Sequence, residues 1–349
     1  MSTPAVAARP ADPTAASPVG LALGVDVGGT KTAWVITDAD DNLLRHAVEP
    51  TDTAALASQL IAISRAAIDG LARGPEGKDG DRIDAIGVAI PGQVDSASGT
   101  IKLAVNLGAR DLPLAALVEA GVGLPCFVEH DARAAAAWLY GLPTESPTET
   151  PSDVIYLSLG TGISASLVLG GQPLRGQNGL AGEIGHVTAD PEGSRCACGL
   201  RGCLETVAAG PAIARQVSEC IAAGRPTVLA DGATASDVFA AAETGDQLAL
   251  EIADRVAAHL ARAIRALVLI VGAQRVIIGG GVSGAGQAML DRVVRSIADE
   301  RAASPLAAAA LGGVVVELLP PDLEAGARGA AAIARQRVAA DRGRGVAAR

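Results

Sequence analysis

The stretch LALGVDVGGTKTAWVITDADDNLL, residues 21–44, decides the fold. It begins as an apolar run, turns at a Gly-Gly pair, continues as a second largely apolar run and ends in an Asp/Asn-rich turn. Apolar runs bounded by glycine and Asp/Asn clusters are typical of β-strands joined by tight turns. The stretch therefore predicts a β-hairpin at the start of the ordered chain.

A second stretch of the same kind, VIYLSLGTGISASLVLGGQPL, occupies residues 154–174. It repeats the order strand, glycine turn, strand, so that Gly28-Gly29-Thr30 corresponds to Gly160-Thr161-Gly162. Such a recurrence indicates a duplicated structural unit. We expect two related lobes with a cleft between them, because 349 residues exceed what one hydrophobic core usually organises.

The segments around the two hairpins alternate in type, which indicates an α/β fold. Apolar runs predict buried strands at residues 84–95, 124–130 and 275–281. Amphipathic or Ala-rich runs predict helices at residues 52–72, 131–141 and 325–340 and a helical region at residues 211–271.

A Pro/Thr/Ser/Glu-rich stretch, residues 143–152, has the composition of a surface loop and separates the two halves. We therefore expect an N-terminal lobe at residues 20–138, against which the helix 325–340 packs back. The C-terminal lobe is expected at residues 139–324, a disordered leader at residues 1–19 and a solvated Arg-rich tail at residues 341–349.

Composition excludes several classes of protein. A net charge of −10 and an aromatic content of 2% argue against nucleic-acid binding, which needs a basic face or stacking side chains. No apolar run is long enough to span a membrane, and the leader lacks the apolar core of an export signal. We expect a cytoplasmic homodimer that takes small molecules as substrates.

Both glycine turns can hold phosphate groups. Glycine lets backbone N–H groups approach phosphate oxygens closely, and Thr30, Lys31 and Thr161 would add side-chain contacts. Asp26 precedes the first turn and would face Mg²⁺ through water. Gly-Thr hairpins are also common structural turns, and an Asp beside such a turn is often only a structural hydrogen-bonding residue. The phosphate-binding interpretation therefore depends on the occurrence of two such turns in one chain.

A third glycine cluster, residues 279–284, follows an apolar strand and matches G-x-G-x-x-G. This pattern suggests a nicotinamide-dependent oxidoreductase as a competing hypothesis. That fingerprint usually opens its own βαβ domain, whereas the cluster lies near the end of the chain and leaves the duplicated turns unexplained. We interpret Gly280 and Gly281 as part of an adenosine-binding turn.

Three cysteines crowd into one polar, glycine-rich loop as Cys196-x-Cys198-x₄-Cys203, and His186 lies upstream of them. Three thiolates and one imidazole form a donor set that suits tetrahedral Zn²⁺. Four protein ligands leave no open position, so the metal would be structural. The alternative is that the three cysteines are small residues of a hydrophobic core, but the loop is polar and does not suit a core.

Five segments together resemble the ROK family, named for its repressors, open reading frames and kinases. They are Asp26-Val-Gly-Gly-Thr-Lys31, Leu159-Gly-Thr-Gly162, Glu183-Ile-Gly-His186, Cys196-x-Cys198-x₄-Cys203-x-Glu205 and Gly279-Gly-Gly-Val-Ser283. Resemblance to its glucokinase branch implies a duplicated actin-like (ribonuclease H-like) fold, ATP-Mg²⁺ held by the two phosphate turns and a structural zinc.

The same resemblance implies specific roles. Glu183, His186 and Glu205 would hydrogen-bond sugar hydroxyls, and the Pro91-Gly92 turn would offer a backbone donor. Asp131 would be the catalytic base that accepts the proton of the 6-hydroxyl of a hexose. An Asp between a strand and a helix is also an ordinary N-cap, and both roles can coexist.

Three departures from the family pattern affect the substrate. The segment Glu129-His130-Asp131-Ala132-Arg133 has lost two asparagines, and the first of these normally contacts the sugar near its 3-position. Ala109 replaces an aromatic residue, and Ser164 stands where glycine is usual. A neutral imidazole can accept a hydrogen bond from an ammonium group. His130 therefore suggests 3-amino-3-deoxyglucose (kanosamine) as the preferred substrate, with glucose as the alternative, whereas a histidine at a strand end can also be a neutral change without a function.

A sugar-sensing regulator is the competing function within the family. Its repressors carry a helix-turn-helix before the first strand, and only about twenty Ala/Pro-rich residues precede Leu21 here. The sequence therefore favours a kinase.

Overall fold

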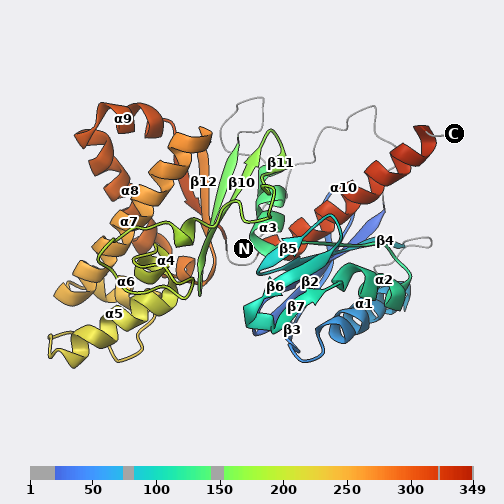
Figure 1. Cartoon of the computed structure of the whole chain (residues 1–349), viewed down its shortest axis with the longest axis horizontal. Coiled ribbons are helices and arrows are strands. Elements are labelled where there is room, and N and C mark those ends of the chain that lie inside the picture. The colour runs from blue at the N-terminus through green and yellow to red at the C-terminus, as the bar shows by residue number, and fades with distance from the viewer. Residues whose placement is uncertain (1–19, 74–81, 143–152, 321–322, 348–349) are drawn as a thin grey trace. The chain divides into compact units, whose positions relative to one another are not determined.

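The computed structural model describes residues 20–73, 82–142, 153–320 and 323–347 (Figure 1). These residues form two compact units: unit 1 is drawn from residues 1–151 and 324–349, and unit 2 from residues 152–323. The expected leader, residues 1–19, and the expected interlobe stretch, residues 143–152, lie outside the described residues.

Unit 1 consists of strands, helices and one 3₁₀ turn in mixed order. Its elements are β1 (Leu21–Val27), β2 (Lys31–Thr37), β3 (Leu43–Pro50), α1 (Leu56–Arg73), β4 (Ile83–Ile90), β5 (Gln93–Asp95), β6 (Thr100–Ala104), η1 (Val105–Leu107), β7 (Ala109–Leu112), α2 (Leu114–Val122), β8 (Cys126–His130), α3 (Asp131–Tyr140) and α10 (Ala325–Ala347).

Unit 2 begins with a hairpin and continues mostly as helices. Its elements are β9 (Val154–Leu159), β10 (Ile163–Leu169), β11 (Gln172–Pro173), η2 (Ile184–His186), α4 (Glu205–Ala208), α5 (Gly210–Ala222), α6 (Ala235–Glu243), α7 (Gln247–Val271), β12 (Arg275–Gly279), η3 (Gly281–Ala285), α8 (Gly286–Ala303), α9 (Pro305–Leu311) and β13 (Val315–Leu318).

The main sheets of the two units have the same topology. Their five strands run in the orders β3-β2-β1-β4-β8 and β11-β10-β9-β12-β13 within the described residues. In each sheet an antiparallel hairpin comes first, and the first strand of that hairpin pairs in parallel with a later strand. The predicted hairpins and the predicted duplication are therefore confirmed, whereas the additional sheet β5-β6-β7 in unit 1 was not predicted.

The two faces of the unit 1 sheet carry side chains of different size. Along β1 the large residues Leu21, Leu23, Val25 and Val27 pack into a core shared with α1 and α2. The residues between them, Ala22, Gly24 and Asp26, face the other way, as the alternation of a strand requires. Strand β4 repeats the pattern with Ala85, Gly87 and Ala89. One face is therefore smooth enough for a helix to approach closely.

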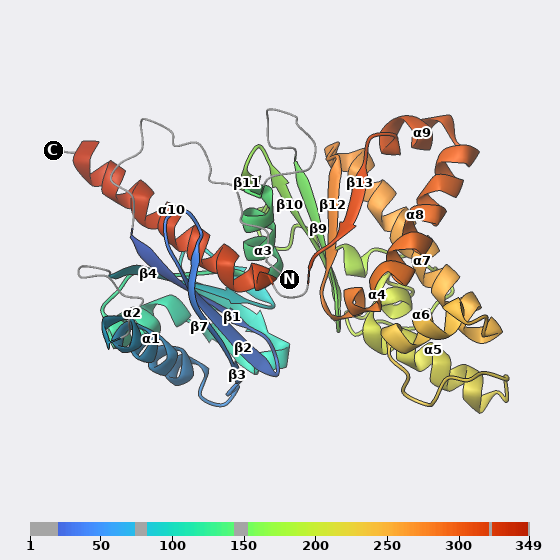
Figure 2. The ribbon, with the colours of Figure 1, turned by 180° about the vertical axis from the view of Figure 1, so that it is seen from behind.

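Helix α10 lies on this smooth face, together with α3 (Figure 2). A Cβ atom at Gly87 would lie 1.9 Å from the carbonyl oxygen of Ala330, and one at Gly329 would lie 1.9 Å from that of Ala134. Backbones this close leave no room for any side chain at either position. These contacts fix α10 against β4 and fix α3 against α10.

The end of α10 differs from the expectation. The helix runs to Ala347 and does not stop at residue 340. Arg335 is largely buried and donates to the hydroxyl of Thr37, and Arg342 lies 3.5 Å from the carboxylate of Asp84. The contact of Arg342 holds the start of the expected Arg-rich tail near β4.

The core of unit 2 is formed mainly by aliphatic and alanine side chains from β9, β10, β12 and the helices α5 to α8. Helix α7 is buried along one side through residues such as Val256, Leu260 and Ile264.

Within the described residues, no helix is both long enough and apolar enough to cross a membrane.

Candidate functional site

The first phosphate turn joins β1 to β2. The N–H group of Gly28 donates to the carbonyl of Lys31 at 2.8 Å, which closes the turn, while Gly29, Thr30 and Lys31 are exposed. Thr51 supports the turn from the side, because its hydroxyl donates to the carbonyl of Gly28 at 2.8 Å. Hydrogen bonds with Lys31 and Thr51 thus hold Gly28 in place, and Gly29 and Thr30 are exposed to solvent.

Asp26 is the penultimate residue of β1, two residues before Gly28, on the face covered by α10. A Cβ atom at Gly326, in the first turn of α10, would lie 2.3 Å from Oδ2 of Asp26. Burial, together with the negative charges of Asp131 and Glu324, raises the pKa of Asp26 to about 7, and the positive charge of Lys31 acts in the opposite direction. Asp131 therefore lies close enough to Asp26 within unit 1 for its negative charge to act on the Asp26 carboxyl.

Asp131 is the first residue of α3, directly after β8. His130 occupies the N-cap position and makes no side-chain cap hydrogen bond, so Asp131 is not the N-cap residue. Oδ1 of Asp131 accepts from the N–H group of Ala132 at 2.6 Å, and the side chain is 37% exposed. Its carboxylate is accessible to a proton donor from solvent or substrate.

The two departures beside Asp131 have different surroundings. His130 is nearly buried, and its Nδ1 lies 3.1 Å from Oδ1 of Asp131. Arg133 is 2% exposed and its Nε donates to Oε1 of Glu129 at 2.8 Å. The same oxygen accepts from the hydroxyl of Ser96 at 2.8 Å. Glu129 therefore ties the end of β8 and the start of α3 to the β5–β6 turn.

Gly92 lies in the turn between β4 and β5. Its φ of 102° and the carbonyl of Leu103, 2.4 Å from where a Cβ atom would lie, restrict this position to glycine. The Pro91-Gly92 turn therefore has a fixed backbone, as a backbone donor would require.

The second phosphate turn joins β9 to β10 and is held at both ends by one segment. The N–H group of Gly210 donates to the carbonyl of Gly160 at 2.9 Å. The N–H group of Ile163 donates to Oε2 of Glu205 at 3.0 Å. Thr161 is exposed between these two contacts.

The third glycine cluster adjoins the second phosphate turn. A Cβ atom at Gly280 would lie 2.4 Å from the carbonyl oxygen of Leu159, the last residue before the turn. The cluster leaves β12, forms η3 and then enters α8. The structure thus brings Gly280 and Gly281 next to Gly160, which the sequence alone did not establish.

Glu183 directly precedes the 3₁₀ turn η2, and His186 is the last residue of this turn, which packs on β10. Gly182 and Gly185 allow the contact, since Cβ atoms there would lie 1.8 Å and 2.2 Å from the carbonyl oxygens of Ala165 and Ile163. The N–H group of Ala165 donates to the carbonyl of Gly182 at 2.7 Å. This packing places both candidate sugar contacts on the strand that leaves the phosphate turn.

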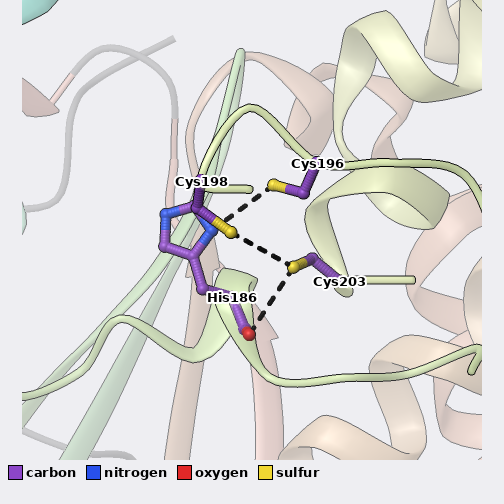
Figure 3. Close-up of side chains that lie close together, drawn as sticks. All are labelled: His186, Cys196, Cys198 and Cys203. Carbon is purple, nitrogen blue, oxygen red and sulfur yellow. Dashed lines mark hydrogen bonds between the residues drawn. The ribbon is translucent and has the colours of Figure 1, made fainter. Parts of the chain in front are cut away.

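The four predicted zinc ligands converge (Figure 3). Sγ of Cys196 lies 3.7 Å from Nδ1 of His186, and Sγ of Cys198 lies 3.6 Å from Sγ of Cys203. All four ligand atoms lie within 4.8 Å of one another. Ligands of a tetrahedral Zn²⁺ are separated by roughly 3.5–3.8 Å, so the donor set and its spacing fit this ion.

The sequence interpretation missed two sets of contacts around the candidate site. The contacts of Glu129 with Ser96 and Arg133 were not predicted, although two charged residues four positions apart in an apolar segment are a signal for an ion pair. The proximity of Glu324 to Asp26 was also missed, because these residues are almost the whole chain apart. No local pattern indicates such a contact.

Comparison with known proteins gives a consistent result. The model of the ROK family matches residues 22–337. A glucokinase of Halalkalibacterium halodurans is 36% identical over 280 residues, covering 77% of this chain and 82% of the relative.

Solved structures of kinases and regulators both match. A ROK family glucokinase from Streptomyces griseus, in complex with glucose and AMPPNP, is 31% identical with a TM-score of 0.68, covering 91% of this chain and 100% of that one. A ROK family transcriptional regulator homologous to the E. coli MLC protein is 25% identical with a TM-score of 0.78, covering 92% of this chain and 79% of that one. The expected actin-like α/β fold is confirmed, and the chain belongs to the ROK family.

Proposed function

We propose that this protein is a sugar kinase that transfers the γ-phosphoryl group of ATP to the 6-hydroxyl of glucose. The similarity to ROK glucokinases over most of both chains supports this assignment. The observation that carries it is Asp131, whose partly exposed carboxylate stands at the start of α3, directly after β8.

In the proposed reaction Asp131 accepts the proton of the 6-hydroxyl. The oxygen forms a bond to the γ-phosphorus as the bond from that phosphorus to the β–γ bridging oxygen breaks, and ADP leaves. A positioned base of this kind typically contributes a hundredfold or more to the rate. Glu129 would keep Asp131 in place, because it anchors both β8 and α3.

The glycine turns are the proposed nucleotide contacts. Gly28, Gly29, Thr30 and Lys31 would hold phosphate oxygens in unit 1, and Gly160, Thr161 and Gly162 would do so in unit 2, with Gly280 and Gly281 near the adenosine. Bound Mg²⁺ would neutralise charge on the transferred group. Asp26 would orient this ion through water, and its acidic surroundings suit a cation.

Glu183, His186, Glu205 and the Gly92 backbone are the proposed sugar contacts. Nδ1 of His186 faces Cys196, so its Nε2 is the nitrogen left for a sugar hydroxyl.

We further propose that His186, Cys196, Cys198 and Cys203 hold one structural Zn²⁺, since four protein ligands complete a tetrahedral coordination sphere. The free thiols of all five cysteines suit the reducing cytoplasm, and a homodimer stays an expectation.

Kanosamine is a second candidate substrate, supported by His130 alone. Since Nδ1 of His130 faces the carboxylate of Asp131, a proton on Nδ1 would leave Nε2 as an acceptor for a 3-ammonium group. The comparisons favour glucose, because the relatives named above include glucokinases.

Replacing the base tests the proposed function directly. We expect Asp131→Asn to lower kcat for glucose by about a hundredfold or more while glucose and ATP binding change little, because the amide keeps the size but takes no proton. The exposed Asp299→Asn serves as the control. A loss below about tenfold in a folded variant contradicts the role.

The raised pKa of Asp26 predicts an effect on stability. Its protonated form is favoured in the folded state, so the folded protein loses stability as the pH rises from about 4 to 7, where the folded carboxyl ionises. We expect Asp26→Asn to be more stable than the wild type by about 1–3 kcal/mol at pH 8, with the difference vanishing near pH 4.

Urea unfolding without nucleotide or Mg²⁺, repeated across this pH range, measures the difference. The same variant should lose most ATP turnover if Asp26 orients Mg²⁺. A stability difference that does not depend on pH would contradict the account of Asp26.

Zinc content tests the four-ligand site. We expect one zinc per chain in protein purified without added metal, and well under one in Cys198→Ser, because a thiolate ligand is lost. Elemental analysis measures it, with Cys220→Ser as the matched control outside the cluster. A wild type with little zinc that strong chelators leave unaffected would remove the assignment.

The substrate candidates are separated by the ratio of kcat/KM for glucose to kcat/KM for kanosamine. We expect His130→Asn to move this ratio towards glucose, because the carboxamide restores the family's usual residue and removes the imidazole acceptor. His46→Asn, an exposed histidine on β3, is the control. A ratio unchanged by His130→Asn excludes kanosamine recognition by this residue.

A further inference from the structure

Glu205 sits directly against the second phosphate turn. Its Oε2 accepts the N–H group of Ile163, the first residue after the turn, at 3.0 Å. A Cβ atom at Gly162 would lie only 2.5 Å from the same oxygen. The carboxylate therefore fills the space that a side chain on the turn would need, and it fixes the backbone where β10 begins.

The segment that contains Glu205 holds the other end of the turn as well. The N–H group of Gly210, the first residue of α5, donates to the carbonyl of Gly160 at 2.9 Å. Residues 205–210 thus hydrogen-bond the chain on both sides of Thr161. The conformation of the turn depends on where α4 lies.

Helix α4 is in turn anchored to the loop of the proposed zinc ligands. Leu204 follows Cys203, and its N–H group donates to the carbonyl of Val187 at 2.9 Å. The hydroxyl of Thr206 donates to the carbonyl of Cys203 at 2.7 Å. Glu205 therefore connects the zinc loop and the segment after His186 to the phosphate turn.

The second oxygen of Glu205 is available for a ligand. Among the described residues, Oε1 has no hydrogen-bond partner, and Glu205 is only partly buried. Glu205 and Thr161 line one hollow of about 230 Å³ together with Cys196 and Arg215. One carboxylate can thus contact the turn with one oxygen and a bound molecule with the other.

We propose that Glu205 is a positioning residue that couples sugar binding to nucleotide binding. This inference rests on the proposed function, in which Glu205 contacts a sugar hydroxyl. A hydroxyl bound at Oε1 restricts the carboxylate, and the restricted carboxylate orders the phosphate turn through the N–H group of Ile163. Sugar then strengthens nucleotide binding, and nucleotide strengthens sugar binding by the same factor.

The experiment measures the dissociation constant of AMPPNP by calorimetry, with and without saturating glucose, in the presence of Mg²⁺. We expect glucose to tighten AMPPNP binding about fivefold or more in the wild type. In Glu205→Ala the turn loses its acceptor, so AMPPNP should bind about tenfold more weakly without glucose, and the effect of glucose should disappear.

Two further variants separate coupling from loss of structure. Glu205→Gln retains an acceptor for Ile163, so its glucose-free AMPPNP affinity should stay within about threefold of the wild type while its glucose effect falls by half or more. Glu183→Ala should weaken glucose binding without changing AMPPNP affinity in the absence of glucose. The thermal midpoint and zinc content of each variant verify folding.

The outcomes separate this inference from the proposed function. A wild type that phosphorylates hexoses, combined with Glu205→Ala of unchanged AMPPNP affinity or Glu205→Gln of unchanged glucose effect, overturns the coupling alone. A wild type with no hexose turnover overturns the proposed function, and the coupling falls with it.

Discussion

The close backbone contact between α10 and the sheet of unit 1 is the constraint on which the rest of that unit depends. Gly24 and Gly87 permit it, and the other small residues of β1 and β4 extend it along the strands. Dispersion forces favour such an interface when the opposing surfaces match closely. Since aromatic residues make up only 2% of the chain, the fit of glycine and alanine replaces the packing of large side chains.

This contact also sets the electrostatic surroundings of Asp26. Asp26 faces α10 because its side chain lies on the same side of β1 as Ala22 and Gly24. Glu324, the residue before α10, lies close enough for its charge to act on Asp26. Helix α3 packs on α10, and Asp131 is its first residue. Asp26 is thus an ionisable residue near the end of an apolar strand, an arrangement that costs stability when the carboxyl is charged and is common at functional sites.

The sequence predicted local features well and long-range ones poorly. The two hairpins follow from glycine turns between apolar runs, and the zinc cluster follows from cysteines within one loop. Neither needs knowledge of distant parts of the chain. The contact of Asp26 with α10 joins opposite ends of the sequence, and the support of the second phosphate turn by Glu205 joins two segments about forty residues apart. Such contacts depend on how the elements pack, which a strand or helix pattern does not encode.

The placement of α10 also affects how the chain is made. Unit 1 contains β1, near the start of the sequence, and α10, near its end, with all of unit 2 encoded between them. During translation the smooth face of β1 and β4 therefore stays uncovered while unit 2 is being synthesised. Unit 2 is continuous in sequence and can complete its core first. Helix α10 must leave the ribosome before it can cover Asp26.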